Sequence, residues 1–165
     1  MNTLLATSPR PARTYRTGTI TWGLRALGVL GALGVTAWIL ARYPSLPDTV
    51  ATHFDASGQA DDWGPKWSIL VLAGVMLLLS LGLAALSSRP RAFNYPLEIT
   101  ADNAQTVYRE GERLMVWTLL GLVAIYAGIA WSTVLTGGAP LIAVGVVVMV
   151  AAVVIGIIRL VRAGR

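Results

Sequence analysis

The chain has 165 residues and no cysteine, which excludes disulfides, thiolate catalysis and cysteine-bound metal centres. Hydrophobic residues make up 55% of it and charged residues 13%, with a mean hydropathy of +0.65, a balance that argues against a soluble domain. The formal net charge of +5 would fit nucleic-acid binding. However, the arginines are spread over three segments that border apolar runs, where they meet lipid headgroups, so no nucleic-acid partner is expected.

Four apolar runs each approach the ~20 residues that are needed to cross ~30 Å of hydrocarbon. Two stretches, 71–79 and 144–158, are apolar on all sides, which favours contact with the lipid bilayer. We therefore predict an all-α integral membrane protein, a four-transmembrane-helix bundle with a small extracytoplasmic loop cap. The expected spans are residues 19–41, 67–86, 114–135 and 140–158.

The first run follows a basic segment, as in a secretory signal. Its apolar stretch is longer than that of a signal and no small-x-small cleavage site follows it, so we expect an uncleaved anchor. Residues 1–18, polar and containing prolines, are expected to form a disordered tail.

Basic residues are distributed asymmetrically between the connections. Only Arg42 and Lys66 fall in the first loop, residues 42–66, whereas the other basic residues lie in or beside the tails and the middle loop. By the positive-inside rule both termini, the loop 87–113 and the tail 159–165 are cytoplasmic. The loop 42–66 and the turn 136–139 then face outward.

Small residues recur every fourth position on two of the predicted helices, namely Gly28, Ala32 and Thr36, and Ala124, Gly128 and Ser132. This pattern is typical of close helix packing within the chain, and a homo-oligomer face is the alternative. The short turn 136–139 makes the last two spans an antiparallel hairpin. The middle of the spans holds no Asp, Glu, Lys or His, which disfavours ion-coupled transport, and Arg25 lies close enough to the cytoplasmic end to snorkel.

The outward loop contains most of the unusual residues, between positions 46 and 66. Alternation around His53 and Phe54 predicts a short extended segment with these two side chains on opposite faces. Asp55 and Gly58 predict a turn, in which the carboxylate caps backbone amides and glycine takes a positive φ. Trp63 and Trp67 are expected at the headgroup layer.

The same loop also contains groups that could form a chemical site. His53 and nearby aspartates could bind a divalent cation, but Gly58 and Lys66 stand at the wrong positions for a calcium loop and there is no second histidine. Ser57 lacks a nucleophile elbow. We expect no catalytic residue, no metal and no cofactor, and keep a metal-dependent membrane hydrolase as one alternative.

Our leading hypothesis is a non-enzymatic protein that binds a peptide or an envelope protein through the loop 46–66. The expected contact residues are His53, Phe54, Asp55, Gly58, Asp61, Trp63 and Lys66. The other alternative is a small structural subunit, or a transporter-associated component, of a larger membrane complex.

The inward loop, residues 87–113, allows two interpretations. Thr100 is expected to cap a helix that continues into the third span, with Arg109, Glu110, Glu112 and Arg113 on its water-exposed, headgroup-level surface. In the second interpretation, the loop is a docking site for a cytoplasmic regulator. Its expected residues are Asn94, Tyr95, Pro96, Arg109 and Arg113.

Two motifs carry a resemblance to a known family. Leu46-Pro47, His53-Phe54-Asp55, Gly58, Asp61 and Lys66 resemble the domain of unknown function at the start of SdpI-type bacterial membrane proteins, and Asn94-Tyr95-Pro96 resembles a cytoplasmic segment of many relatives. The resemblance implies a protein of the bacterial cytoplasmic membrane that gives immunity to a secreted toxic peptide and holds a cytoplasmic repressor at the membrane. Ala51 departs from the proline that relatives often have. We expect a four-span form, without the further membrane domain of the full immunity protein.

Overall fold

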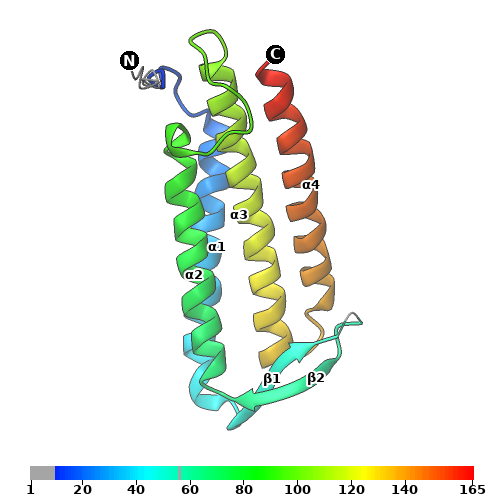
Figure 1. The fold of residues 1–165 in the computed structure, drawn as a ribbon. Coiled ribbons are helices and arrows are strands. Elements are labelled where there is room, and N and C mark those ends of the chain that lie inside the picture. Colours follow the sequence, from blue (N-terminus) through cyan, green and yellow to red (C-terminus); the bar gives the residue numbers. More distant parts are fainter. Residues whose placement is uncertain (1–9, 56) are drawn as a thin grey trace, which may run out of the picture.

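The computed structural model describes residues 10–55 and 57–165, and within them the chain forms four long helices with a two-stranded sheet across one end (Figure 1). The helices are α1 (Thr19–Arg42), α2 (Ser68–Ser87), α3 (Ala104–Val134) and α4 (Ala139–Ala163). All four are long and apolar enough to cross a membrane. The strands are β1 (Thr49–Phe54) and β2 (Ala60–Pro65), and single 3-10 turns, Tyr43–Ser45 and Pro90–Ala92, follow α1 and α2.

The two ends of the bundle differ in structure. The sheet and the α3–α4 turn lie at one end, which we call the hairpin end (Figure 1). The other end, the terminal end, holds the loop between α2 and α3 and the C-terminus (Figure 1). Arg10 lies there as well, because it donates hydrogen bonds to the carbonyls of Arg91 and Phe93 in that loop. The predicted four-helix arrangement is confirmed, whereas the all-α assignment is corrected by the small antiparallel sheet.

Helices α3 and α4 extend well beyond the predicted spans at the terminal end. Helix α3 begins at Ala104, ten positions before the expected span, because the helix of the inward loop continues into the span without a break. Thr100 does not start this helix. Instead its hydroxyl accepts a hydrogen bond from the backbone N–H of Asn103 (3.3 Å), which is the residue before the first helical turn.

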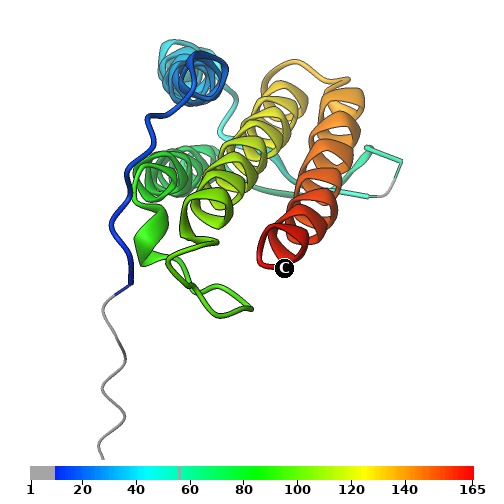
Figure 2. The same ribbon diagram turned by 90° about the horizontal axis from the view of Figure 1, so that it is seen from above.

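Helix α3 is the centre of the bundle. It packs against α1 and α2 on one side and against α4 on the other, so that α4 lies apart from α1 (Figure 2). Glycines allow the close approaches: a Cβ atom at Gly28 would lie 2.7 Å from Leu119, and one at Gly128 would lie 2.6 Å from Ile142. Both small-residue stripes therefore face neighbouring helices of the same chain, as the close-packing interpretation predicts.

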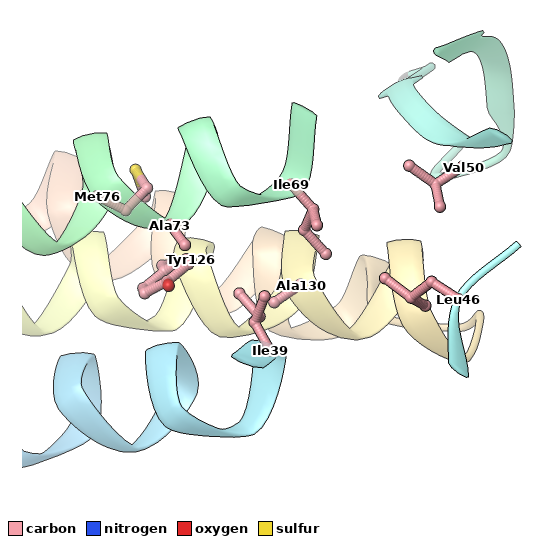
Figure 3. Packing of buried hydrophobic residues seen from close by; sticks show 8 residues of the cluster. All are labelled: Ile39, Leu46, Val50, Ile69, Ala73, Met76, Tyr126 and Ala130. Atoms are coloured by element: carbon pink, nitrogen blue, oxygen red, sulfur yellow. The ribbon is translucent and has the colours of Figure 1, made fainter. Parts of the chain in front are cut away.

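Strands β1 and β2 and the turn between them form a β-hairpin, which is called the hairpin from here on. A buried apolar cluster connects it to the helices (Figure 3). Its inner part is formed by Ile39, Ala73, Met76 and Tyr126, and the phenol oxygen of Tyr126 lies 2.9 Å from the hydroxyl of Thr36. The cluster continues toward the hairpin end. There it includes Leu46, Val50, Ile69 and Ala130. Because Val50 of β1 is only 3% exposed, the sheet is anchored on the bundle.

Large apolar side chains cover most of the outside of the helices. Leu78, Val147 and Leu30 are exposed by 72%, 66% and 66%, and the outward face of α4 is apolar along its length. In water such surfaces would be unfavourable, whereas lipid tails solvate them. The fold is that of a multi-pass integral membrane protein.

Candidate functional site

The hairpin is organised by the turn that joins its strands. The Asp55 carboxylate accepts hydrogen bonds from the backbone N–H groups of Ser57 and Gln59, both at 2.9 Å, and from the Ser57 hydroxyl at 2.7 Å. Gly58 has φ +81°, a conformation that favours glycine. These contacts confirm the predicted turn, and they lower the pKa of Asp55, with the Ser57 hydroxyl as the main cause.

The pairing of the strands is irregular at its centre. Ala51 pairs with Trp63, His53 with Asp62 and Phe54 with Ala60, so the register shifts on both sides of His53. A β-bulge of this kind redirects side chains. The predicted extended segment is present, but its inward alternation is interrupted, because Val50 is buried and Thr52 is exposed.

The bulge brings His53 and Asp61 together. His53 Nδ1 lies 2.6 Å from Asp61 Oδ1, and the two side chains are 67% and 49% exposed. The hydrogen bond to Asp61 is the main cause that raises the pKa of His53, with the charges of Asp61, Asp62 and Asp55 adding to it. The charged imidazolium therefore persists to a higher pH than in a free histidine.

The other expected contact residues divide into three groups. Phe54 is half-buried and Trp63 is 58% exposed, so both offer aromatic surface near the His53–Asp61 pair. Lys66 forms an ion pair with Asp48 (3.0 Å) at the base of the hairpin. Asp55 and Gly58, by contrast, are committed to the turn, and a Cβ on Gly58 would collide with Ala139 at the start of α4.

Two hollows lie between the hairpin and the helices. The first, of about 310 Å³, is mainly apolar and lies between β1, including His53 and Phe54, and the adjoining ends of α2, α3 and α4, including Ile69, Ile129 and Ile142. The second, of about 480 Å³, lies between the hairpin and the α3–α4 turn. The Ser132 side chain lines the second hollow, and its hydroxyl has no hydrogen-bond partner among residues 10–55 and 57–165.

The residues expected to dock a cytoplasmic regulator are dispersed at the terminal end. Tyr95 is half-buried, donates a hydrogen bond to the carbonyl of Pro90 (2.9 Å) and packs against Gly111 of α3, so it holds the loop on the bundle. Asn94 and Pro96 are exposed. Arg109 lies over the ring of Tyr15 (4.9 Å) and Arg113 is paired with Glu110 (2.5 Å). These five residues thus lie at the same end of the bundle, and Tyr95, Arg109 and Arg113 make separate contacts there.

Glu112 is the residue whose position differs most from the position predicted from the sequence. It was expected on the water-exposed surface, but it is 1% exposed. Its carboxylate accepts hydrogen bonds from Arg25 (2.5 Å), Thr17 (2.7 Å) and Tyr15 (2.8 Å), and Arg13 lies 3.4 Å away. Four donors from the N-terminal part of the chain therefore satisfy one buried charge on α3.

This cluster also changes the description of the N-terminal segment. Of the tail predicted to be disordered, residues 10–17 contact the bundle, and residues 1–9 lie outside the described part of the chain. Arg10 donates to the carbonyl of Phe93, and Gln105 donates to that of Ala12. The Arg25 side chain does not extend to the headgroup layer, as snorkelling would require. Its Nε donates a hydrogen bond to the Ser87 hydroxyl (2.8 Å), and its terminal nitrogen donates one to Glu112.

A spacing signal for Glu112 was present in the sequence. Tyr108 and Val116 stand four residues to either side of Glu112 and therefore share its face of the helix. Both are hydrophobic, and both are buried in the structure, so Glu112 lies on the inward face of α3. Burial raises the pKa of Tyr15, and the hydrogen bond to Glu112 adds to this, so the Tyr15 phenol remains a neutral donor.

The fold and the hairpin define a multi-pass membrane protein with a folded cap on one end of its bundle. Residues 30–77 match the family model described as "Domain of unknown function (DUF1648)", which covers the second half of α1, the hairpin and the first half of α2. The match extends over less than half of the chain. No curated protein and no solved structure matches the chain.

Proposed function

We propose that this chain is a non-enzymatic bacterial membrane protein, of the immunity or signalling kind that the SdpI-type resemblance implies. In this proposal the hairpin end faces outward and residues 46–66 bind a peptide or an envelope protein. Both termini lie in the cytoplasm, because the basic residues concentrate at the terminal end. The observation that carries the proposal is the exposed His53–Asp61 pair, which the anchored hairpin holds beside an apolar hollow.

The exposed pair is better explained by recognition than by folding. Ion pairs in water contribute little to stability, because solvent screens them and ordering two side chains costs entropy. In this position the pair offers directional polar groups next to the half-buried Phe54 and the exposed Trp63. An apolar contact area with a few fixed polar groups is the usual composition of a ligand site.

The form and charge of the hairpin favour an extended, basic partner segment. The described sheet has two strands, so each strand has one edge without a neighbouring strand, to which an extended peptide can add. The loop is also acidic. Asp48, Asp55, Asp61 and Asp62 lie in it, against Lys66 and the titratable His53. Lysine and arginine side chains of a partner would complement this charge.

Photocrosslinking in living cells tests the proposal. A probe at Phe54 should give a discrete adduct with a partner. For the terminal end, Asn94 is a better probe position than Tyr95, because Asn94 is exposed whereas Tyr95 is packed on α3. An adduct from Asn94 alone would instead identify a cytoplasmic regulator, and it would contradict binding through the hairpin.

Substitutions separate the contact residues from their neighbours. His53→Ala and Asp61→Asn should abolish the Phe54 adduct while the protein remains folded in the membrane. Asp62→Asn is the matched control, because Asp62 is adjacent, yet its carboxylate accepts a hydrogen bond from the Trp63 backbone (2.9 Å). Equal adducts from all three variants would refute the proposed site.

A subunit role that acts through the glycine-rich helix faces gains no support from the structure. Such a subunit would contact its complex through small residues such as Gly28 and Gly128. Both are packed against neighbouring helices of the same chain. Bulky replacements there would disturb the fold before they disturbed an assembly.

A further inference from the structure

A groove lies between α3 and α4 near the terminal end, far from the hairpin. It has a volume of about 330 Å³. Small residues of α4, Ala152 and Gly156, form the hollow opposite Leu114 and Trp117 of α3. The lining of α4 runs from Val148 to Arg159, which at 1.5 Å per residue makes the groove roughly 16 Å long. That is about half of the ~30 Å hydrocarbon thickness, the depth of one leaflet.

The charged residues of the groove are confined to one end. Arg113, Glu110 and Arg159 form the rim toward the terminal end, and the remaining lining is apolar. The carboxylate of Glu110 lies 2.5 Å from Arg113 and neutralises it. Arg159 has no ion pair or hydrogen bond with any residue in the described ranges 10–55 and 57–165. The rim therefore carries one uncompensated positive charge. The remaining, apolar part of the groove is called the trough.

We infer that the α3–α4 groove binds an anionic glycerophospholipid of the surrounding bilayer, with its phosphate at Arg159 and Arg113 and an acyl chain in the trough. The neighbouring helix faces are apolar, so the groove is surrounded by lipid and needs no other occupant to cover it. Trp117, 46% exposed, lies one turn below Arg113, where an indole ring suits the boundary between headgroups and tails.

The charge of the terminal end decides the class of lipid. Arg162 and Arg165 follow Arg159 on the same helix end, so the surroundings of the rim are positive as well. Basic sites between transmembrane helices attract anionic headgroups, whereas a zwitterionic headgroup brings its own cation and gains less. This inference is independent of the partner proposed for the hairpin.

Native mass spectrometry of the full chain, released from detergent, tests the inference. Phosphatidylglycerol should bind more tightly than phosphatidylcholine with identical acyl chains. Arg159→Gln should weaken phosphatidylglycerol binding about fivefold, the effect of one basic residue near an anionic surface. The matched control is Arg162→Gln, which removes an arginine from the same helix end but not from the groove lining, and it should have a smaller effect.

Two further variants act in opposite directions. Glu110→Gln should increase phosphatidylglycerol affinity, because it frees Arg113 from its ion pair. Ala152→Leu should fill the trough and weaken the binding of both lipids. A gain of affinity cannot arise from misfolding, so Glu110→Gln keeps the test decisive even if another variant is unstable.

Several results would overturn the inference. Equal binding of the two lipids would show that the site does not select an anionic headgroup. Equal losses in Arg159→Gln and Arg162→Gln would mean that the basic end attracts lipid without a site. Full competition by inorganic phosphate would identify a free-phosphate site, and unchanged binding in Ala152→Leu would exclude the trough.

Discussion

Replacement of Glu112 by alanine should be among the most damaging polar substitutions in this chain. The carboxylate side chain is 2% exposed, and its charged partners Arg25 and Arg13 are 16% and 22% exposed. Removing one partner of a buried ion pair leaves the other charge uncompensated, at a cost of about 3–5 kcal/mol. The hydrogen bonds from Tyr15 and Thr17 would be lost as well.

Equilibrium unfolding in mixed micelles, by titration with SDS, measures this free energy. Glu110→Ala is the matched control, because Glu110 is two residues away on the same helix and pairs with the exposed Arg113. The free energy of unfolding should fall less in Glu110→Ala, because the Arg113 side chain that is left unpaired is 45% exposed to solvent. Trypsin should also cleave after Arg13 faster in Glu112→Ala, because the N-terminal segment loses its anchor. Similar unfolding free energies for the two variants would refute the buried-charge argument.

A double-mutant cycle tests whether Arg25 is the cation that stabilises the Glu112 carboxylate. Arg25→Met alone should destabilise the protein, because it leaves the Glu112 carboxylate underpaired. In the Glu112→Ala background the same change should destabilise much less, since the charge that Arg25 serves is gone. Additive effects would mean that Arg25 and Glu112 act independently.

Two further predictions concern helix packing and the hairpin. Gly128→Ala should destabilise the protein by about 1–3 kcal/mol in the same SDS titration, because the new Cβ would overlap α4, whereas Gly34→Ala, with no atom within 4 Å, should be neutral. The pKa of His53, followed by NMR titration of its imidazole, should lie above the usual 6.5 and return toward it in Asp61→Asn. Because the pKa is raised by this contact, any stabilisation of the hairpin by the pair is complete below pH 6.5 and is lost as the pH rises through the pKa of the folded state. An unchanged His53 titration in Asp61→Asn would show that the two groups do not interact in solution.

The two ends of the bundle hold polar side chains of different kinds. At the hairpin end the polar groups are exposed and make few contacts, which suits recognition of an outside partner. At the terminal end the Glu112 cluster is buried and joins α1, α3 and residues 10–17. Substitutions at the two ends should therefore have different signatures, with partner binding affected at one and stability at the other.

Part of the hairpin could be read from the sequence and part could not. The turn was predictable because Asp55 and Gly58 have strong local preferences. Strand β2 was not predicted, because Ala60–Pro65 contains glycine, proline and two aspartates, residues with poor strand propensity. Its strand conformation comes from pairing with β1, which is itself fixed by the burial of Val50.

The sequence by itself determined the membrane spans, the antiparallel helix order and the turns. These depend on the length of apolar runs and on local backbone preferences, both of which are properties of neighbouring residues. Only the tertiary structure decided that His53 meets Asp61 and that Glu112 turns inward. Glu112 turns inward because distant segments bring donors to its buried charge, whereas His53 meets Asp61 because the register of the strand pairing shifts at the bulge.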